Sequence, residues 1–243
     1  MPTAALLRTP SQTRAVRTRE ALLAAGAREF SARGYAATTT KSIADRAGVA
    51  TGSFYQYFAD KDALLRELAE TRLSGLARDT FGAQGEVASV ALPASTAKDE
   101  VPLLRERVER LLRHVVDVVI AAHREDPGLH AVLTERRHQD PAVAALWSAR
   151  ERELVTKIAA LLTVVAHEGD RDATAFILFA MVEGAVHAHV LGHAHVSDAR
   201  FRLALLRALA QIVLGRETDG PSPKKARPAR KPARKPGATS PKR

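Results

Sequence analysis

Apolar residues recur every three or four positions along most of the chain, which is the spacing of an α-helix with one buried face. The fold class is therefore expected to be all-α, with about nine helices. Residues 82–100 carry no such stripe and are rich in Gly, Ser, Pro and Ala, which predicts a mobile loop. The pattern predicts helices over residues 14–33, 40–48, 51–58, 60–80 and 102–124, a short one ending near 137, and further ones over 141–167, 171–191 and 198–214.

The last two predicted helices are unusually apolar. Residues 171–191 are apolar on almost every side, and a helix of that kind must be covered on every side. Residues 198–214 also carry more apolar residues than one small bundle can bury. A second copy of the chain is the simplest cover, so the sequence predicts a homodimer formed through these two helices.

The stretch from Thr39 to Lys61 predicts two short helices joined by a tight turn. Thr40 is expected to cap the first helix, and Gly48 to end it in the left-handed conformation. Asp60 is expected to cap the helix that follows the pair. Lys61, in the first turn of that helix, faces the positive end of the helix dipole, so an external anion is its expected partner.

The second short helix, predicted over Thr51 to Phe58, presents small residues first and then polar aromatic ones. Gly52 and Ser53 would let a phosphate approach the backbone closely. Phe54 and Phe58, four positions apart, would face inward and leave Tyr55 and Gln56 outside. Such side chains can meet base edges or phosphates.

This stretch resembles the DNA-binding domain of the TetR family of bacterial transcriptional regulators, over roughly Arg14 to Leu76. Two positions depart from the family pattern: Ala50 replaces the usual capping Ser, so that Thr51 takes over the cap or the helix starts one residue later, and Tyr57 replaces a frequent His. The residues that carry the resemblance are Phe30, Gly34, Tyr35, Thr39, Thr40, Ile43, Ala44, Ala47, Gly48, Val49, Tyr55, Tyr57, Phe58, Lys61, Leu64 and Leu65.

The resemblance implies a homodimeric DNA-binding regulator, most often a repressor whose second domain binds a small-molecule effector. Each subunit would place its second short helix in a major groove, and the dimer would read a near-palindrome with half-sites roughly 34–36 Å apart. The domains are expected to be a disordered basic arm (1–13), a helix-turn-helix domain (14–60), a helical effector-binding and dimerisation domain (61–215) and a disordered tail (216–243).

The residues expected to contact double-stranded DNA fall into two groups. Those expected to anchor phosphates are Thr40, Lys41, Ser53, Tyr57 and Lys61; those expected nearest base edges are Thr51, Gly52, Tyr55 and Gln56.

An effector pocket would be built from polar groups placed among apolar ones. The candidates are His123, Trp147, Phe176, Phe179 and Glu183, for each of which plain core packing is the alternative. Asp117 lies within a run of valines, but its helical phase predicts an ordinary surface pair with Arg113.

The composition narrows the function further. The chain of 243 residues has no Cys, which excludes disulfides, thiolate catalysis and Cys-based zinc sites. No Ser-His-Asp order, Gly-rich phosphate loop or HExxH motif is present, so neither an enzyme nor a cofactor is expected. No secretory signal and no membrane-length apolar segment is apparent, which predicts a cytoplasmic, nucleoid-associated protein with no membrane partner.

The net charge of +10 is concentrated at the C-terminal end. Residues 216–243 hold ten basic and two acidic residues, whereas residues 81–215 hold 15 basic and 17 acidic residues. Such a tail binds DNA without reading its sequence, or only keeps the protein soluble. A nucleoid-type DNA binder led by the tail is therefore the competing hypothesis, and deletion of residues 217–243 discriminates between the two.

All nine His residues lie between His114 and His195. His189 and His193 are four positions apart on one helical face, as are Glu183 and His187, a spacing that can hold a metal. No third ligand is fixed by the sequence, so no metal site is expected. A helical metal sensor is the third hypothesis, and metal analysis of the purified protein tests it.

Overall fold

The computed structural model describes residues 13–82, 101–165, 167–192 and 195–214, and within these ranges every regular element is a helix. The expected all-α fold class is confirmed. The predicted arm up to residue 12, the predicted 82–100 loop beyond Gly82, the tail and His193 lie outside the described residues, while Thr13, assigned to the arm, is the first residue of α1. The helices are α1 (Thr13–Ala37), α2 (Thr40–Ala47), α3 (Thr51–Phe54), α4 (Lys61–Phe81), α6 (Val101–Glu125), α7 (Pro127–Gln139), α8 (Pro141–Val164), α9 (Arg171–Leu191) and α10 (Asp198–Leu214).

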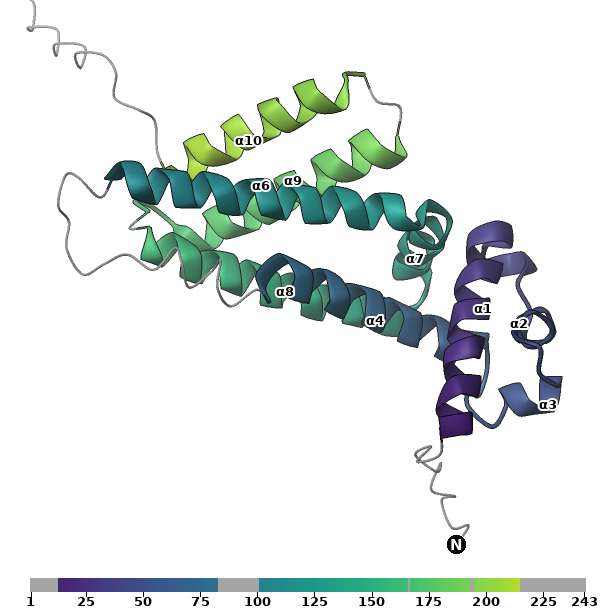
Figure 1. The fold of residues 1–243 in the computed structure, drawn as a ribbon. Helices are drawn as coiled ribbons and strands as arrows, with labels where there is room; N and C mark the ends of the chain where they lie inside the picture. The colour runs from purple at the N-terminus through teal and green to yellow at the C-terminus, as the bar shows by residue number, and fades with distance from the viewer. Residues whose placement is uncertain (1–12, 83–100, 166, 193–194, 215–243) are drawn as a thin grey trace, which may run out of the picture.

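The first three helices form a small unit at one end of the molecule (Figure 1). Its core consists of fully buried apolar side chains from each helix, among them Phe30, Ile43 and Phe54. Gly34 interrupts the helical path of α1 with φ of 73°, a left-handed conformation that favours glycine, at the position where the sequence predicts the end of the helix.

The long helices α4, α6, α8, α9 and α10 form a bundle, and α7 lies between this bundle and α1 (Figure 1). The Asp60 carboxylate accepts from the Ala63 N–H at 2.7 Å, which confirms the predicted cap of α4. Helix α4 runs from the small unit into the bundle, where it packs on α6 and α8. It therefore connects the two parts directly.

Asp117 is an exposed residue of α6, as predicted, but its predicted partner is wrong. Its carboxylate accepts from Arg202 of α10, whereas Arg113 pairs with Glu109 on its own helix. The prediction considered only neighbours along one helix, and the packing of α10 beside α6 brings a cation from outside it. Asp117 thus helps to join α6 to α10.

Helix α9 is, among the described helices, the one long and apolar enough to cross a membrane by length and composition. This corrects the expectation that no segment approaches such a length. Helix α9 packs on α6, α8 and α10, and its buried face contributes Ala175, Leu178 and Val186 to the bundle core. Its apolar character is accounted for in part by this packing.

Candidate DNA-binding surface and interior histidine cluster

Helix α2 is capped by Thr39, and the predicted cap at Thr40 is wrong. The Thr39 hydroxyl accepts from the Ser42 N–H at 3.0 Å, and the Ser42 hydroxyl accepts in return from the Thr39 N–H at 3.1 Å. A cap residue needs an extended backbone, which Thr39 has (φ −124°, ψ 157°), while Thr40 is already the first helical residue. The Thr40 hydroxyl is consequently free to bond the hydroxyl of Tyr55 at 3.0 Å.

Helix α3 is shorter than predicted. Gly48 ends α2 with φ of 71°, as expected, but the α-helix that follows covers only Thr51–Phe54 and continues as turns to Tyr57. Ala50 stands at the cap position and makes no side-chain hydrogen bond. Thr51 is already the first residue of the helix, so it does not take over the role of the cap. The N–H groups of Tyr57 and Phe58 both donate to the carbonyl of Phe54 at 3.0 Å, which tightens the chain.

The outward residues of the α3 segment lie as predicted. Phe54 and Phe58 are buried with ring centroids 5.7 Å apart, whereas 54% of Tyr55 is exposed and Gln56 is exposed. Thr51, Ser53 and Tyr57 are half-buried. A Cβ added to the exposed Gly52 would meet no atom within 4 Å, so the protein's own packing does not require a glycine there.

The two predicted phosphate-binding lysines differ in their surroundings. Lys41 is exposed and pairs with Asp45 at 3.0 Å. Lys61 donates to the carbonyls of Tyr35 and Thr38, both at 2.8 Å, and its ammonium lies 4.1 Å from the centroid of the Tyr35 ring. These internal acceptors compensate the unfavourable helix dipole, so Lys61 does not require an external anion.

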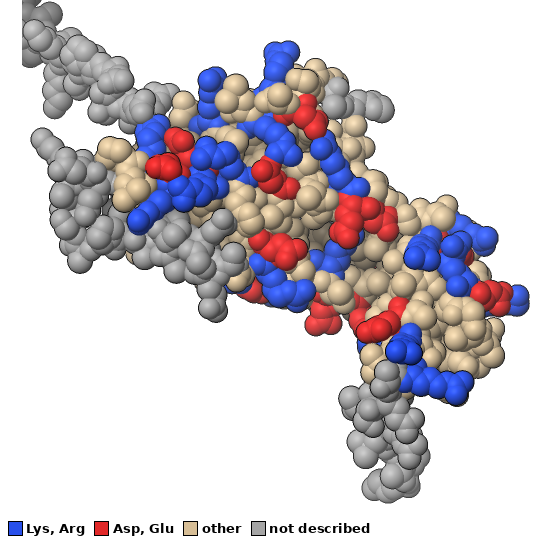
Figure 2. Space-filling view, viewed as in Figure 1, with Lys and Arg blue, Asp and Glu red and all other residues tan. Residues whose placement is uncertain are grey.

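On the face drawn in Figure 2, charge alone does not distinguish the α1–α3 end from the bundle. Figure 2 shows Lys and Arg side chains over both the α1–α3 end and the bundle, with Asp and Glu side chains between them. The surface of the small unit is therefore distinguished by its exposed Tyr55–Gln56 edge rather than by a patch of one charge.

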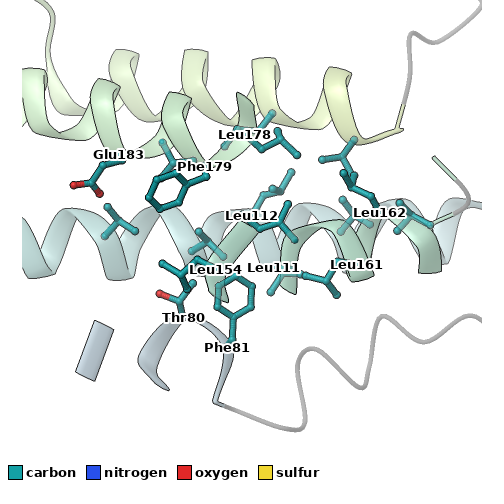
Figure 3. Close-up of a pocket in the computed structure, with 18 of the residues that line it drawn as sticks. Thr80, Phe81, Leu111, Leu112, Leu154, Leu161, Leu162, Leu178, Phe179 and Glu183 are labelled. Atoms are coloured by element: carbon teal, nitrogen blue, oxygen red, sulfur yellow. The ribbon is translucent and has the colours of Figure 1, made fainter. Parts of the chain in front are cut away.

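An apolar cavity of about 130 Å³ lies in the bundle, among α4, α6, α8, α9 and α10. Two of the predicted pocket residues, Phe179 and Glu183, line it (Figure 3), and Glu183 is the only charged residue among the described residues of its lining. Thr80 and Phe81, from the end of α4, also line it. Phe176 does not reach it: this residue lies on the outer face of α9 with 52% of its surface exposed.

A smaller cavity of about 50 Å³ adjoins the first through Phe179 and Glu183. His123 and Trp147, two further candidates, line it, so four of the five predicted residues are brought together around the two cavities. His123 is 2% exposed, as its helical phase predicts.

Two more histidines lie beside His123: His130, which sequence reasoning missed, and His187, which it had considered only as a possible metal pair with Glu183. The three rings have centroids 4.5 to 5.9 Å apart. Burial first, and then the neighbouring His123, His187 and Arg72, lower the pKa of His130 to about 4, so this imidazole is neutral near pH 7. His130 follows a Pro-Gly break, and no periodic spacing relates it to His123 or His187, so the pattern carried no signal for the trio.

The possible metal pair of His189 with His193 stays untested, because His193 lies outside the described residues, but the contacts of His189 itself are clear. Its Nε2 lies 2.8 Å from Oδ1 of Asp198, and its ring stacks on Phe201 with centroids 4.0 Å apart. These contacts join the end of α9 to the start of α10.

The fold therefore defines a helix-turn-helix unit joined to a helical bundle with an interior cavity. Two family models match it in turn: "Bacterial regulatory proteins, tetR family" over residues 22–68, and "Tetracyclin repressor-like, C-terminal domain" over residues 108–213. The chain belongs to the TetR family, as its sequence pattern indicates.

A curated relative is the HTH-type transcriptional repressor KstR2 of Rhodococcus jostii (strain RHA1), 31% identical over 123 residues. That match covers 49% of this chain and only about half, 53%, of the relative. Among solved structures, a TetR-family regulator from Mesorhizobium loti MAFF303099 has a TM-score of 0.62 at 19% identity, over 84% of this chain and 98% of that one. The fatty acid degradation regulator FadR from Bacillus halodurans has a TM-score of 0.57 at 18% identity, over 82% and 95%. At these identities the structures show a shared fold.

Proposed function

We propose that this protein is a ligand-responsive transcriptional repressor that binds a near-palindromic operator as a homodimer. The observation that carries the proposal is the exposed edge of the helix-turn-helix unit. Tyr55 and Gln56 face outward there while Phe54 and Phe58 hold the backbone in place from below. The bond between Tyr55 and Thr40 keeps α2 and α3 in a fixed relation at the surface.

Exposed apolar residues on α9, on α10 and between the two helices support the homodimer. Of the seven large apolar residues that are exposed in the described chain, four fall between residues 176 and 203. They are Phe176, Ile177, Val196 and Leu203. Exposed apolar side chains that gather in one part of a fold often mark an interface, and two-fold pairing of this region with itself would cover them.

The effector is inferred to be a small, mainly apolar molecule that occupies the larger cavity. The described residues of its lining are aliphatic and aromatic apart from Thr80 and Glu183, and the Thr80 hydroxyl already donates to the Leu76 carbonyl at 2.7 Å. Glu183 would therefore select a cationic or hydrogen-bond-donating group on the ligand.

Helix α4 supplies the link between the cavity and the DNA-binding unit. Leu76, Thr80 and Phe81 line the cavity near the end of α4, while Lys61 at its start is bonded to the carbonyls of Tyr35 and Thr38 in the small unit. A bound ligand that shifts α4 would change the distance between the two helix-turn-helix units of a dimer. By linkage, effector and operator would then weaken each other equally, typically by about 1–3 kcal/mol.

Selection of bound sequences from a random duplex pool, with the full chain, tests this proposal. We expect enrichment of an inverted repeat whose half-sites lie about one helical turn apart. A chain ending at residue 216 should enrich the same repeat. Failure of both chains to enrich any sequence would refute the repressor and favour a tail-driven binder.

A further inference from the structure

Three histidines from three different helices meet at one point inside the protein. His123 comes from α6, His130 from α7 and His187 from α9, and one ring nitrogen of each lies within 4.8 Å of the others. Nε2 of His130 and Nδ1 of His187 are 3.2 Å apart. The cluster is at the boundary of the smaller cavity, which His123 and His130 line.

The tautomer of His123 is fixed by its own helix. Nδ1 lies 2.9 Å from the carbonyl oxygen of Val119, which can only accept, so the proton is on Nδ1. In the neutral ring Nε2 then carries a lone pair, and this atom is buried with no hydrogen-bond partner among the described residues. A buried acceptor without a partner is costly, and a backbone carbonyl on the opposite nitrogen is the usual support of a metal-binding imidazole.

We propose that His123, His130 and His187 bind one divalent transition-metal ion of the zinc class. Tetrahedral zinc with Zn–N bonds of about 2.0–2.1 Å places ligand nitrogens roughly 3.3 Å apart, close to the separation of His130 and His187. The Glu183 carboxylate, 3.7 Å from Nε2 of His123, is the nearest candidate for a fourth ligand. A set of imidazoles with one carboxylate suits Zn²⁺, Co²⁺ and Ni²⁺ better than Mg²⁺ or Ca²⁺.

The neighbouring cation does not prevent this. Arg72 lies beside the cluster, but its guanidinium donates to the carbonyl of Ala122 and lies 3.9 Å from the Glu125 carboxylate. The competing explanation is a simple hydrogen bond between His130 and His187. That explanation leaves His123 Nε2 without a hydrogen bond, with the Glu183 carboxylate 3.7 Å away, and predicts no metal affinity that depends on these residues.

A metal at this position would tie α7 to α6 and α9. Helix α7 is also the element on which α1 of the DNA-binding unit packs. Metal binding could therefore change the affinity of the protein for DNA. This consequence rests on the proposed function, whereas metal binding itself does not.

Titration of the purified full chain with Co²⁺, followed by its visible d–d absorption, tests the site directly. We expect one equivalent to bind with a tetrahedral or five-coordinate spectrum, and Zn²⁺ to displace it. His130→Gln and His187→Gln should each weaken binding by more than about 100-fold, because losing even an outer-shell partner costs about 10–100-fold. Circular dichroism of both variants verifies that they are folded.

His138→Gln is the matched control, since His138 is an exposed residue of the same helix as His130. It should bind Co²⁺ like the native chain. The proposal is overturned if the native chain binds no stoichiometric Co²⁺, or if folded His130→Gln and His187→Gln proteins both bind as tightly as the control.

Discussion

The hydroxyl of Ser31 in α1 donates to the Asp126 carboxylate at 2.6 Å, and the same carboxylate oxygen accepts from the Leu129 N–H at 2.9 Å. Asp126 thus caps α7 and holds α1 at the same time. Gly128 lies two residues after Asp126, and a Cβ atom on it would be 2.4 Å from the carbonyl oxygen of Ser31. The DNA-binding unit and the bundle therefore meet through closely packed backbone.

Gly128→Ala should disturb this junction. A methyl group at 2.4 Å from a backbone oxygen forces α1 and α7 apart, and overpacking of this kind costs about 1–3 kcal/mol. Urea unfolding of the two proteins measures the loss. Gly75→Ala is the control, because its Cβ would meet only the Arg78 side chain at 3.8 Å; in the middle of α4 it should stabilise by up to about 1 kcal/mol. Equal effects at the two sites would contradict a tight junction.

Local signals in the sequence were sufficient for most helix boundaries. Asp60 and Asp140 cap α4 and α8 where a short polar side chain precedes a helical stripe, and Gly34 and Gly48 adopt positive φ where a stripe stops. Each of these signals acts over a few residues, so reading the sequence alone recovers it. The choice between Thr39 and Thr40 as cap was not recoverable, since two adjacent threonines carry the same chemistry and only the backbone distinguishes them.

The sequence predicts which single side chains are buried, but not which buried side chains from different helices meet. The phase of α6 buries His123, yet its neighbours His130 and His187 depend on how α7 and α9 cross α6. The same limit explains Asp117 and Arg202, which come from α6 and α10. Contacts between helices follow from tertiary packing, for which a helical period gives no register.

Tyr55→Ala should reduce operator affinity while leaving the protein folded and dimeric. The ring is largely exposed, so its removal costs the core little, whereas each lost base or phosphate contact costs about 1–3 kcal/mol and a dimer loses two. Tyr55→Phe keeps the ring and loses the hydroxyl that bonds Thr40, and it should fall between native and Tyr55→Ala. Fluorescence anisotropy on the selected operator measures both, and native affinity in Tyr55→Ala would rule out this surface.

Arg46→Ala should destabilise the helix-turn-helix unit in a pH-dependent way. Arg46 donates to the nearly buried Glu29 at 2.5 Å, and this hydrogen bond, against the opposing effect of burial, holds the pKa of Glu29 below its usual value near 4.5. The stabilisation is therefore complete above that value and is lost as the pH falls through the lower folded pKa. We expect a loss of about 2–3 kcal/mol at neutral pH, because the buried Glu29 ion loses its hydrogen-bonded partner, and a smaller loss near pH 4.

Arg33→Ala is the matched control for this pair. Its guanidinium lies 3.6 Å from Glu29 and is more than half exposed, so its removal should cost less than about 1 kcal/mol. Urea unfolding at the two pH values gives both comparisons. A loss for Arg46→Ala that does not shrink in acid would show that the Glu29 charge is not its cause.

Phe176→Asp should split the proposed dimer. Phe176 and Ile177 are about half exposed on α9, and no group within the described chain covers them. A charge placed in an apolar interface costs about 2 kcal/mol or more, and the dimer carries two, so the dimer dissociation constant should rise by roughly 30-fold at the least. Leu103→Asp changes a similarly exposed apolar residue on α6 and should leave the constant unchanged. Sedimentation equilibrium measures the dimerisation of both variants. If Phe176→Asp stays as dimeric as Leu103→Asp, the interface lies elsewhere, and another surface would have to hold the two helix-turn-helix units in their two-fold arrangement.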